Sequence, residues 1–160
     1  TNRTMKLQST VKQDATGVNY YSSVKVPLDM MEMKSSDYVI LQNELKKLGC
    51  YDYVVMDMDF PKTIADFKFF ENCNSIVIVT DESENATAKL NKALKAVQIM
   101  DSNAEFAIQP RMWLLKNKTI SNEITQNEIK LLGSFPLYQS VTSNQMAKQL
   151  SLSDMYRQLI

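Results

Sequence analysis

The sequence predicts an α/β protein in which a mostly parallel sheet is flanked by helices. Apolar runs of strand length occur at 53–58 and 75–80, and each is nearly uninterrupted, as in strands that are buried on both faces of a parallel sheet. Stretches with helical spacing of apolar residues separate the runs, as consecutive βα units require. We therefore expect residues 1–160 to form one α/β domain without linkers or repeats.

The first part of the chain predicts a helix between two strands. Residues 1–17 are polar and lack a pattern, so we expect an irregular lead-in, followed by a short strand at 18–22. Ser35 or Ser36 can cap a helix, and Gly49 stands where a C-terminal glycine belongs. The apolar run at 53–58 then follows as a buried strand.

The later part continues the alternation of helices and strands. A short helix is expected over 64–70, after Pro61 has ended the preceding strand. A long helix follows the strand at 75–80, and Asp81 with Glu84 resembles a capping box at its start. Four elements are expected after it: a strand at 112–116, a helix from Thr125 to Leu132 that ends at Gly133, a strand at 134–138, and one or two helices over 143–160.

The composition limits the possible functions. Lys plus Arg and Asp plus Glu balance at 18 each, so net charge gives no reason to expect a nucleic acid partner. No apolar run approaches the length of a membrane span. Histidine is absent, and Cys50 and Cys73 lack the spacing of metal ligands. We expect both cysteines to be core thiols in a reducing compartment.

The most informative stretch is YDYVVMDMDFP at 51–61. An apolar strand that ends in Asp57 places a carboxylate at the carboxyl end of a parallel strand, where open α/β sheets bind ligands. Side chains alternate along a strand, so Asp59 should share a face with Asp57, and the pair could hold hydrated Mg²⁺ and orient an attacking water. The structural alternative is that a strand simply ends in a polar residue. None of the three glycines is followed by Lys-Ser/Thr, so no phosphate-binding loop is present.

Three stretches carry a resemblance to a known family. They are YDYVVMDMDF, SIVIVTDESENATAKLNKALKAVQIM and WLLKNKTISNEITQNEIKLLGSFPLYQS. Their order resembles the later half of a ParA/MinD-type deviant Walker P-loop ATPase, over roughly residues 17–150. Within this superfamily the chain is most similar to the CpaE/TadZ branch, which helps to place pilus assembly machinery at the cell pole. The upstream stretch GVNYYSSVKVPLDMMEMKSS also resembles the segment that precedes the Walker B strand in that branch. The resemblance implies a SIMIBI-type P-loop NTPase fold, with the P-loop upstream of Thr1.

The resemblance also implies roles for particular residues. Asp57 matches the Walker B acidic residue that holds the Mg²⁺ shell. Asn117 matches the Asn-Lys/Arg position whose side chain reads the adenine edge, and an amide can both donate and accept there. Pro136, in SFPLY, matches the strand-end proline that lines the base pocket. The family has a proline close behind the acidic residue, whereas here three residues precede Pro61, which affects the placement of the hydrolytic water.

The function implied by this resemblance is that of an ATP-dependent switch. ATP and Mg²⁺ would be the cofactors, an upstream lysine would contact the phosphates, and ATP binding would drive homodimerisation. Protein components of pilus or secretion assembly would be the partners. The parent protein would be cytoplasmic, at a pole or peripheral to the inner face of the membrane.

A two-component receiver domain is a different interpretation of the same stretch. Asp57 would then be the phosphoacceptor, with Pro61 four residues later and Thr80 as the switch threonine. Receivers also need an early acidic pair, which is not visible, and a Lys-Pro after a later strand, for which Gln109–Pro110 is the only candidate.

A third interpretation is a non-hydrolysing scaffold. An ATPase-like fold would be kept for partner binding, and methionines 30, 31 and 33 or the C-terminal helix would form an adaptable contact surface. Core filling is the commoner use of methionine, so this interpretation ranks below the ATPase.

Overall fold

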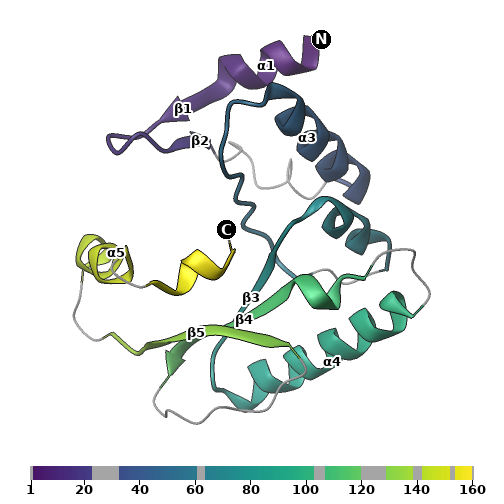
Figure 1. Cartoon of the computed structure of the whole chain (residues 1–160), viewed down its shortest axis with the longest axis vertical. Helices are drawn as coiled ribbons and strands as arrows, with labels where there is room; N and C mark the ends of the chain where they lie inside the picture. Colours follow the sequence, from purple (N-terminus) through teal and green to yellow (C-terminus); the bar gives the residue numbers. More distant parts are fainter. Residues whose placement is uncertain are drawn as a thin grey trace. The chain divides into compact units, whose positions relative to one another are not determined.

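The computed structural model describes residues 2–22, 33–60, 64–102, 107–119, 129–138, 142–151 and 154–159. The chain divides into two compact units, Thr1–Asn72 and Cys73–Ile160, and each is described by itself (Figure 1). The chain is mixed α/β, because helices and a small hairpin form the first unit while a parallel sheet flanked by helices forms the second.

The first unit begins with a helix and a hairpin. Helix α1 spans Asn2–Thr10 and leads directly into β1, Val11–Gln13, which pairs antiparallel with β2, Asn19–Tyr21. The strand expected at 18–22 is therefore confirmed. The irregular lead-in expected over 1–17 is wrong, because α1 buries no side chain and so leaves no apolar periodicity in the sequence.

The hairpin turn is organised by one carboxylate. Asp14 Oδ1 accepts hydrogen bonds from the Thr16 hydroxyl at 2.7 Å and from the N–H groups of Thr16 and Val18 at 2.8 and 2.9 Å. These bonds, the hydroxyl first, hold the pKa of Asp14 below its ordinary value. Gly17 completes the turn with a φ of 92°, which an L side chain rarely adopts.

Helix α3 spans Ser35–Leu48 and ends as the sequence predicts, at Gly49 with a φ of 60°. Its start differs from the prediction, because Lys34 is the N-cap residue and its N–H donates to the Asp37 carboxylate at 2.9 Å. The Ser35 hydroxyl instead donates to the Asp66 carboxylate. Neither predicted serine therefore caps the helix.

The core of the first unit lies between α3 and the 3₁₀ helix η1, Ile64–Asn72, which confirms the short helix expected there. Phe67, Phe69 and Phe70 are buried with Leu45 of α3. The rings of Phe67 and Phe70 lie 5.6 Å apart between centroids with their planes at 68°, an edge-to-face arrangement that favours aromatic packing, and the centroids of Phe69 and Phe70 lie 4.2 Å apart. Gln42 Nε2 also donates to the Phe69 carbonyl at 3.1 Å, so polar and apolar contacts both join the two helices.

The run at 53–58 is not a buried strand. Residues 53–60 form neither helix nor strand, and Val54 and Val55 are 50% and 91% exposed. A strand exists only where a neighbour pairs with its backbone, and no described residue forms a ladder with this run. Met56 and Met58 are half-buried while Asp57 and Asp59 are exposed.

The second unit is built on a three-stranded parallel sheet in the order β3-β4-β5 (Figure 1). The strands span Ile76–Thr80, Met112–Thr119 and Lys130–Pro136. Helix α4, Glu84–Asp101, and the 3₁₀ turn η2, Gln109–Arg111, lie between β3 and β4 in the chain. Helices α5, Ser143–Ser151, and η3, Asp154–Leu159, follow β5.

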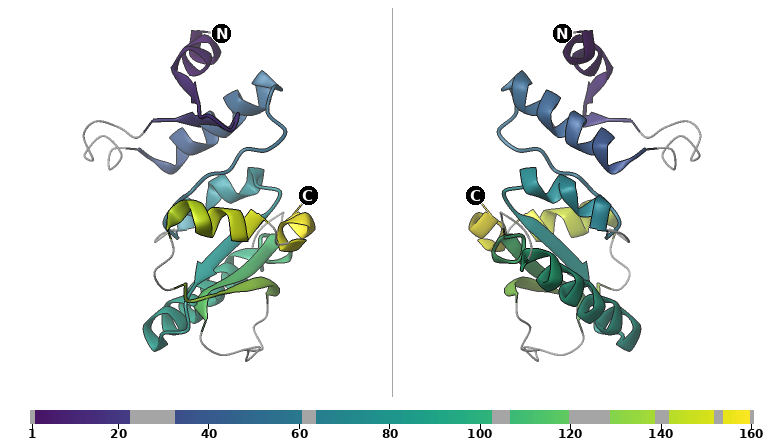
Figure 2. Two further views of the ribbon diagram at one scale, coloured as in Figure 1. Left: turned by 90° about the vertical axis from the view of Figure 1, so that its left-hand side faces the viewer. Right: turned by 90° about the vertical axis from the view of Figure 1, so that its right-hand side faces the viewer.

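The sheet is covered on both faces by helices (Figure 2). Helix α4 lies on one face and turns Leu90, Leu94 and Val97 inward, as its apolar spacing predicts. The other face holds a cluster of Leu115, Leu132 and Phe135, against which Leu150 of α5 and Leu159 of η3 pack. Of the one or two helices expected over 143–160, the structure has two, α5 and η3.

Two details of the second unit correct the sequence prediction. Ser83, not Asp81, caps α4, since its hydroxyl accepts from the Ala86 N–H at 3.2 Å. The helix expected up to Leu132 is wrong over its last residues, because Lys130–Pro136 is a single strand that passes through Gly133. Residues 120–128, which include the predicted cap, lie outside the described part.

The cysteines are only partly as predicted. Both are free thiols, but Cys50 is exposed and Cys73 is half-buried, so Cys50 is not a core residue.

Candidate functional site

The carboxyl ends of three parallel strands meet at one edge of the second unit. Strand β3 ends at Thr80, β4 at Thr119 and β5 at Pro136. This edge is where open α/β sheets bind their ligands. Asn117 lies on β4 near this edge, and Pro136 lies at the end of the neighbouring strand β5, where it pairs with Thr119.

A β-bulge shapes this edge. Lys116 pairs with Ser134 and Thr119 pairs with Pro136, so two residues of β4, Asn117 and Lys118, face a single residue of β5. The strand continues past its predicted end at residue 116, and Asn117 therefore lies inside the ladder rather than in a loop after it.

Local hydrogen bonds hold the bulge. Lys118 has a φ of 57°, a left-handed conformation that is uncommon for a residue with a side chain, and its N–H donates to Asn117 Oδ1 at 3.0 Å. On the far side of the bulge, the Thr119 hydroxyl donates to the Phe135 carbonyl at 3.0 Å, and the Leu137 N–H donates to the Thr119 carbonyl at 3.3 Å. Both ends of the irregular segment are thus tied to β5 or to the residues that follow it.

Asp81 is a charged residue whose pKa responds to Lys118 of the bulge. Asp81, directly after β3, accepts from the Ser83 hydroxyl at 2.6 Å and from the Ser83 N–H at 3.0 Å. The pKa of Asp81 lies below its ordinary value. The hydrogen bond from the Ser83 hydroxyl is the largest cause, followed by the bond from the Ser83 N–H, and the positive charge of Lys118 contributes further. Sequence reasoning assigned no site role to Lys118 or Asp81, although each directly follows a position that it did examine.

The two acidic site residues belong to the other unit. Asp57 and Asp59 are exposed in the segment 53–60, which has no regular secondary structure. Within the described ranges, no three Asp, Glu or Cys side chains gather in a way that could hold a metal ion. Their roles in Mg²⁺ binding and water activation therefore stay predictions.

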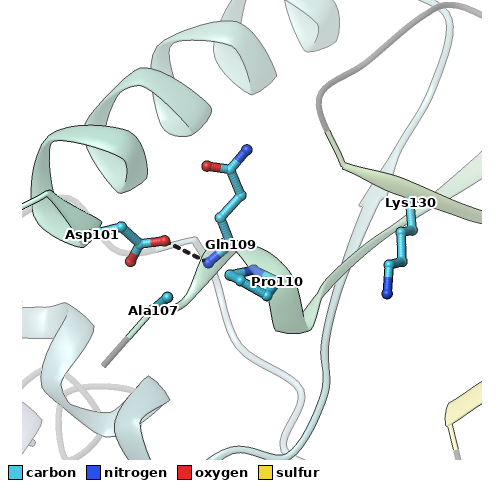
Figure 3. A pocket seen from close by; sticks show the side chains of 5 residues that line it. All are labelled: Asp101, Ala107, Gln109, Pro110 and Lys130. Atoms are coloured by element: carbon cyan, nitrogen blue, oxygen red, sulfur yellow. Dashed lines mark hydrogen bonds between the residues drawn. The ribbon is translucent and has the colours of Figure 1, made fainter. Parts of the chain in front are cut away.

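A cavity of about 420 Å³ lies at the opposite, amino edge of the sheet (Figure 3). Asp101, Ala107, Gln109, Pro110 and Lys130 line it. The Asp101 carboxylate accepts from the Ile108 and Gln109 N–H groups, each at 2.7 Å, and so joins the end of α4 to η2. Lys130 Nζ lies 5.2 Å from the centroid of the Trp113 ring. Both charged groups thus have structural partners, and the cavity is remote from the carboxyl edge.

Comparison with known proteins shows a likeness at the level of fold. A crystal structure of a ParA family ATPase from Chlorobium tepidum TLS matches with a TM-score of 0.63 and 15% sequence identity. The match covers 98% of this chain but 66% of that one, so the chain spans just under two thirds of the ATPase. No family model matches the sequence, and no curated protein does. The chain therefore has a ParA-like α/β fold.

In the described part of the chain, no helix is both long enough and apolar enough to cross a bilayer.

Proposed function

We propose that this chain is part of an ATP-binding switch protein of the ParA/MinD type, with the base-binding site at the carboxyl edge of β4 and β5. The observation that carries the proposal is that Asn117 and Pro136 lie on neighbouring parallel strands, toward the carboxyl edge of the sheet. The likeness in fold to a ParA family ATPase supports it independently of those two residues.

Different residues of the chain suit the base of a nucleotide and the Mg²⁺ ion that accompanies its phosphates. Asn117 offers an amide that both donates and accepts, and Pro136 offers an apolar ring, which together suit a purine. Asp57 and Asp59 are oxygen donors of the kind that Mg²⁺ takes, and their exposure leaves them open to a hydrated ion. A bound Mg²⁺ would neutralise phosphate charge, and Asp57 would orient its water shell. The phosphate contacts would come from outside residues 1–160.

The finer role that we propose follows the CpaE/TadZ branch. ATP binding would favour a homodimer that engages pilus or secretion components at the cell pole, and slow hydrolysis would return the protein to its free state. Energetically, ATP can act as such a switch only if it binds the dimer more tightly than the monomer.

The test compares Asp57→Asn with Asp52→Asn in the full-length protein. Both residues are exposed, so both variants should fold normally. We expect Asp57→Asn to lower Mg²⁺-dependent ATP hydrolysis by at least about tenfold, because loss of one charged transition-state contact commonly has that effect. The matched Asp52→Asn control should hydrolyse ATP at the normal rate.

The outcomes separate the alternatives. Equal hydrolysis by the two variants would reject the role of Asp57. ATP binding without any hydrolysis in the unaltered protein would favour the scaffold. Stoichiometric phosphorylation of Asp57 by a small phosphodonor would favour the receiver, although Gln109–Pro110 lies in the 3₁₀ turn η2 directly before β4.

A further inference from the structure

We propose that the outer side of helix α4 is a docking surface for an acidic amphipathic helix of a partner protein. This surface, the lysine stripe, consists of Ala88, Lys92, Lys95 and Ile99, all of which are exposed. Lys89 is exposed beside it. The lysine stripe includes no residue of the nucleotide site, so the inference goes beyond the proposed function.

The spacing of the lysine stripe places it on the side of α4 that faces away from the sheet. The helix lies along the outside of the sheet (Figure 2) and buries Leu90, Leu94 and Val97. With about 3.6 residues per turn, positions 88, 92, 95 and 99 fall on the opposite side of the helix. Successive members lie four, three and four residues apart, the spacing with which one helix contacts another over several turns.

Positive charge is concentrated on this side of the helix. Residues 85–100 include Lys89, Lys92 and Lys95 but no Asp or Glu, although the chain as a whole has 18 basic and 18 acidic residues. Lysines one turn apart on a helix repel one another, so this arrangement does not serve the stability of the helix alone. In the described part of the chain, none of the three lysines forms an ion pair. Carboxylates of a partner can therefore pair with them without displacing a described carboxylate of this chain.

Ile99 adds an apolar contact to the lysine stripe. It is 63% exposed and follows Lys95 by one turn on the same side of the helix. Lysine stems also present apolar surface while their ammonium groups stay in water. A partner helix that carries both carboxylates and apolar side chains would cover the whole stripe. The phosphate backbone of a nucleic acid would pair with the lysines but leave Ile99 exposed.

A second copy of α4 fits the lysine stripe less well than an acidic helix does. In an antiparallel pair of helices, Lys92 of each copy would face Lys95 of the other, and in a parallel pair each lysine would face its own counterpart. Either arrangement brings like charges together, whereas an acidic helix replaces the repulsion with attraction. Complementary charge of this kind also selects a partner and speeds its association. The charge pattern therefore favours a partner protein over self-association through α4.

The experiment measures peptide binding to the full-length protein by fluorescence anisotropy. The probe is a labelled helical peptide of about three heptads, with Glu and Leu in its contact stripe. We expect joint replacement of Lys89, Lys92 and Lys95 by Gln to weaken binding about tenfold, because three exposed ion pairs are lost. Ile99→Gln should weaken binding about fivefold, because an apolar contact is lost.

A matched control removes the same charge from exposed lysines outside α4 by replacing each with Gln. These lysines are Lys12, Lys46 and Lys148. The control variant should bind the peptide as tightly as the unaltered protein does. Every substituted position is exposed, so all variants should fold normally, and circular dichroism checks this.

Three results would overturn the inference. Equal weakening by the two triple variants would show that net charge acts rather than the lysine stripe. Absence of binding to the unaltered protein would show that α4 does not dock an acidic helix. Tighter binding of a DNA duplex or of phosphatidylglycerol vesicles, lost with the α4 lysines but unchanged in Ile99→Gln, would assign the stripe to a nucleic acid or a membrane surface instead.

Discussion

Similar apolar runs adopt different structures in the two units. In the second unit, Ile76–Thr80 is a strand because β4 pairs with it along its whole length. In the first unit, the comparably apolar run at 53–58 has no strand partner among the described residues and leaves Val55 91% exposed. An apolar run is thus compatible with a strand, but the strand forms only where a neighbouring backbone supplies hydrogen-bond partners.

The cores of the units also differ in kind. The first unit depends on three phenylalanines of η1 that pack on α3. The second is mostly aliphatic and is divided between the two faces of the sheet. A single large side chain therefore accounts for more of the buried surface in the first unit than in the second, which leads to the first prediction.

Phe67→Ala is expected to have the largest effect. Phe67 is 3% exposed and contacts the rings of both Phe60 and Phe70. Removing its ring should lower the free energy of unfolding of the first unit by about 3–5 kcal/mol. Hydrogen exchange of α3 and η1 amides measures this directly. Unchanged protection of α3 would show that the aromatic cluster is not the core of this unit.

Leu114→Ala should destabilise the second unit by about 2–5 kcal/mol, because Leu114 is 1% exposed. Leu131 pairs with it on β5 and is 39% exposed, so Leu131→Ala is a matched control with a smaller expected loss. Urea unfolding followed by Trp113 fluorescence compares the two. Equal losses would mean that β4 and β5 are buried alike, contrary to the pattern described.

Val55→Lys tests the contrast between the apolar runs. We expect a change in unfolding free energy below about 0.5 kcal/mol, as for ordinary exposed positions. The matched Val77→Lys variant places a charge beside the Leu115 cluster and should cost about 2 kcal/mol or more. Thermal unfolding by circular dichroism measures both. A large loss from Val55→Lys would show that this run is buried in the native protein.

The smallest expected effect concerns the hairpin of the first unit. The pKa of Asp14 lies below its ordinary 3.8, so its stabilising hydrogen bonds are fully present above that pH. They are lost as the pH falls through the lower folded value. Titration of the Asp14 carboxyl by NMR measures this. Thr16→Val removes the largest cause and should move the pKa back towards 3.8, and an unchanged value would contradict the assignment.

Local signals predicted much of the second unit. The apolar spacing of α4 and the run in β3 survive in the structure because α4 buries its apolar face and β3 pairs with β4 along its whole length. The first residues of β5 were predicted as the end of a helix, and a bulge explains why. Leu114 pairs with Leu131 and Leu115 with Gly133, which leaves Leu132 as the extra residue. Buried Leu132 and Phe135 are then three apart, a helical spacing within a strand.

The candidate site was predictable only in part. The family resemblance indicated Asn117, and the carboxyl edge follows from parallel pairing with β5. The bulge at Lys118 was not predictable, because it depends on a backbone conformation and not on side-chain chemistry. Whether Asp57 and Asp59 bind a metal depends on groups that no local pattern specifies.

The strand order also has a consequence for how the second unit folds. Each strand of the β3-β4-β5 sheet pairs with its neighbour in the chain, so the sheet needs no late strand to insert between two earlier ones. The β4–β5 pairing closes a much shorter loop than the β3–β4 pairing, and short closures cost less entropy. We expect β4 and β5 to associate first in refolding, with the bulge already formed, and β3 to add to the edge that they present.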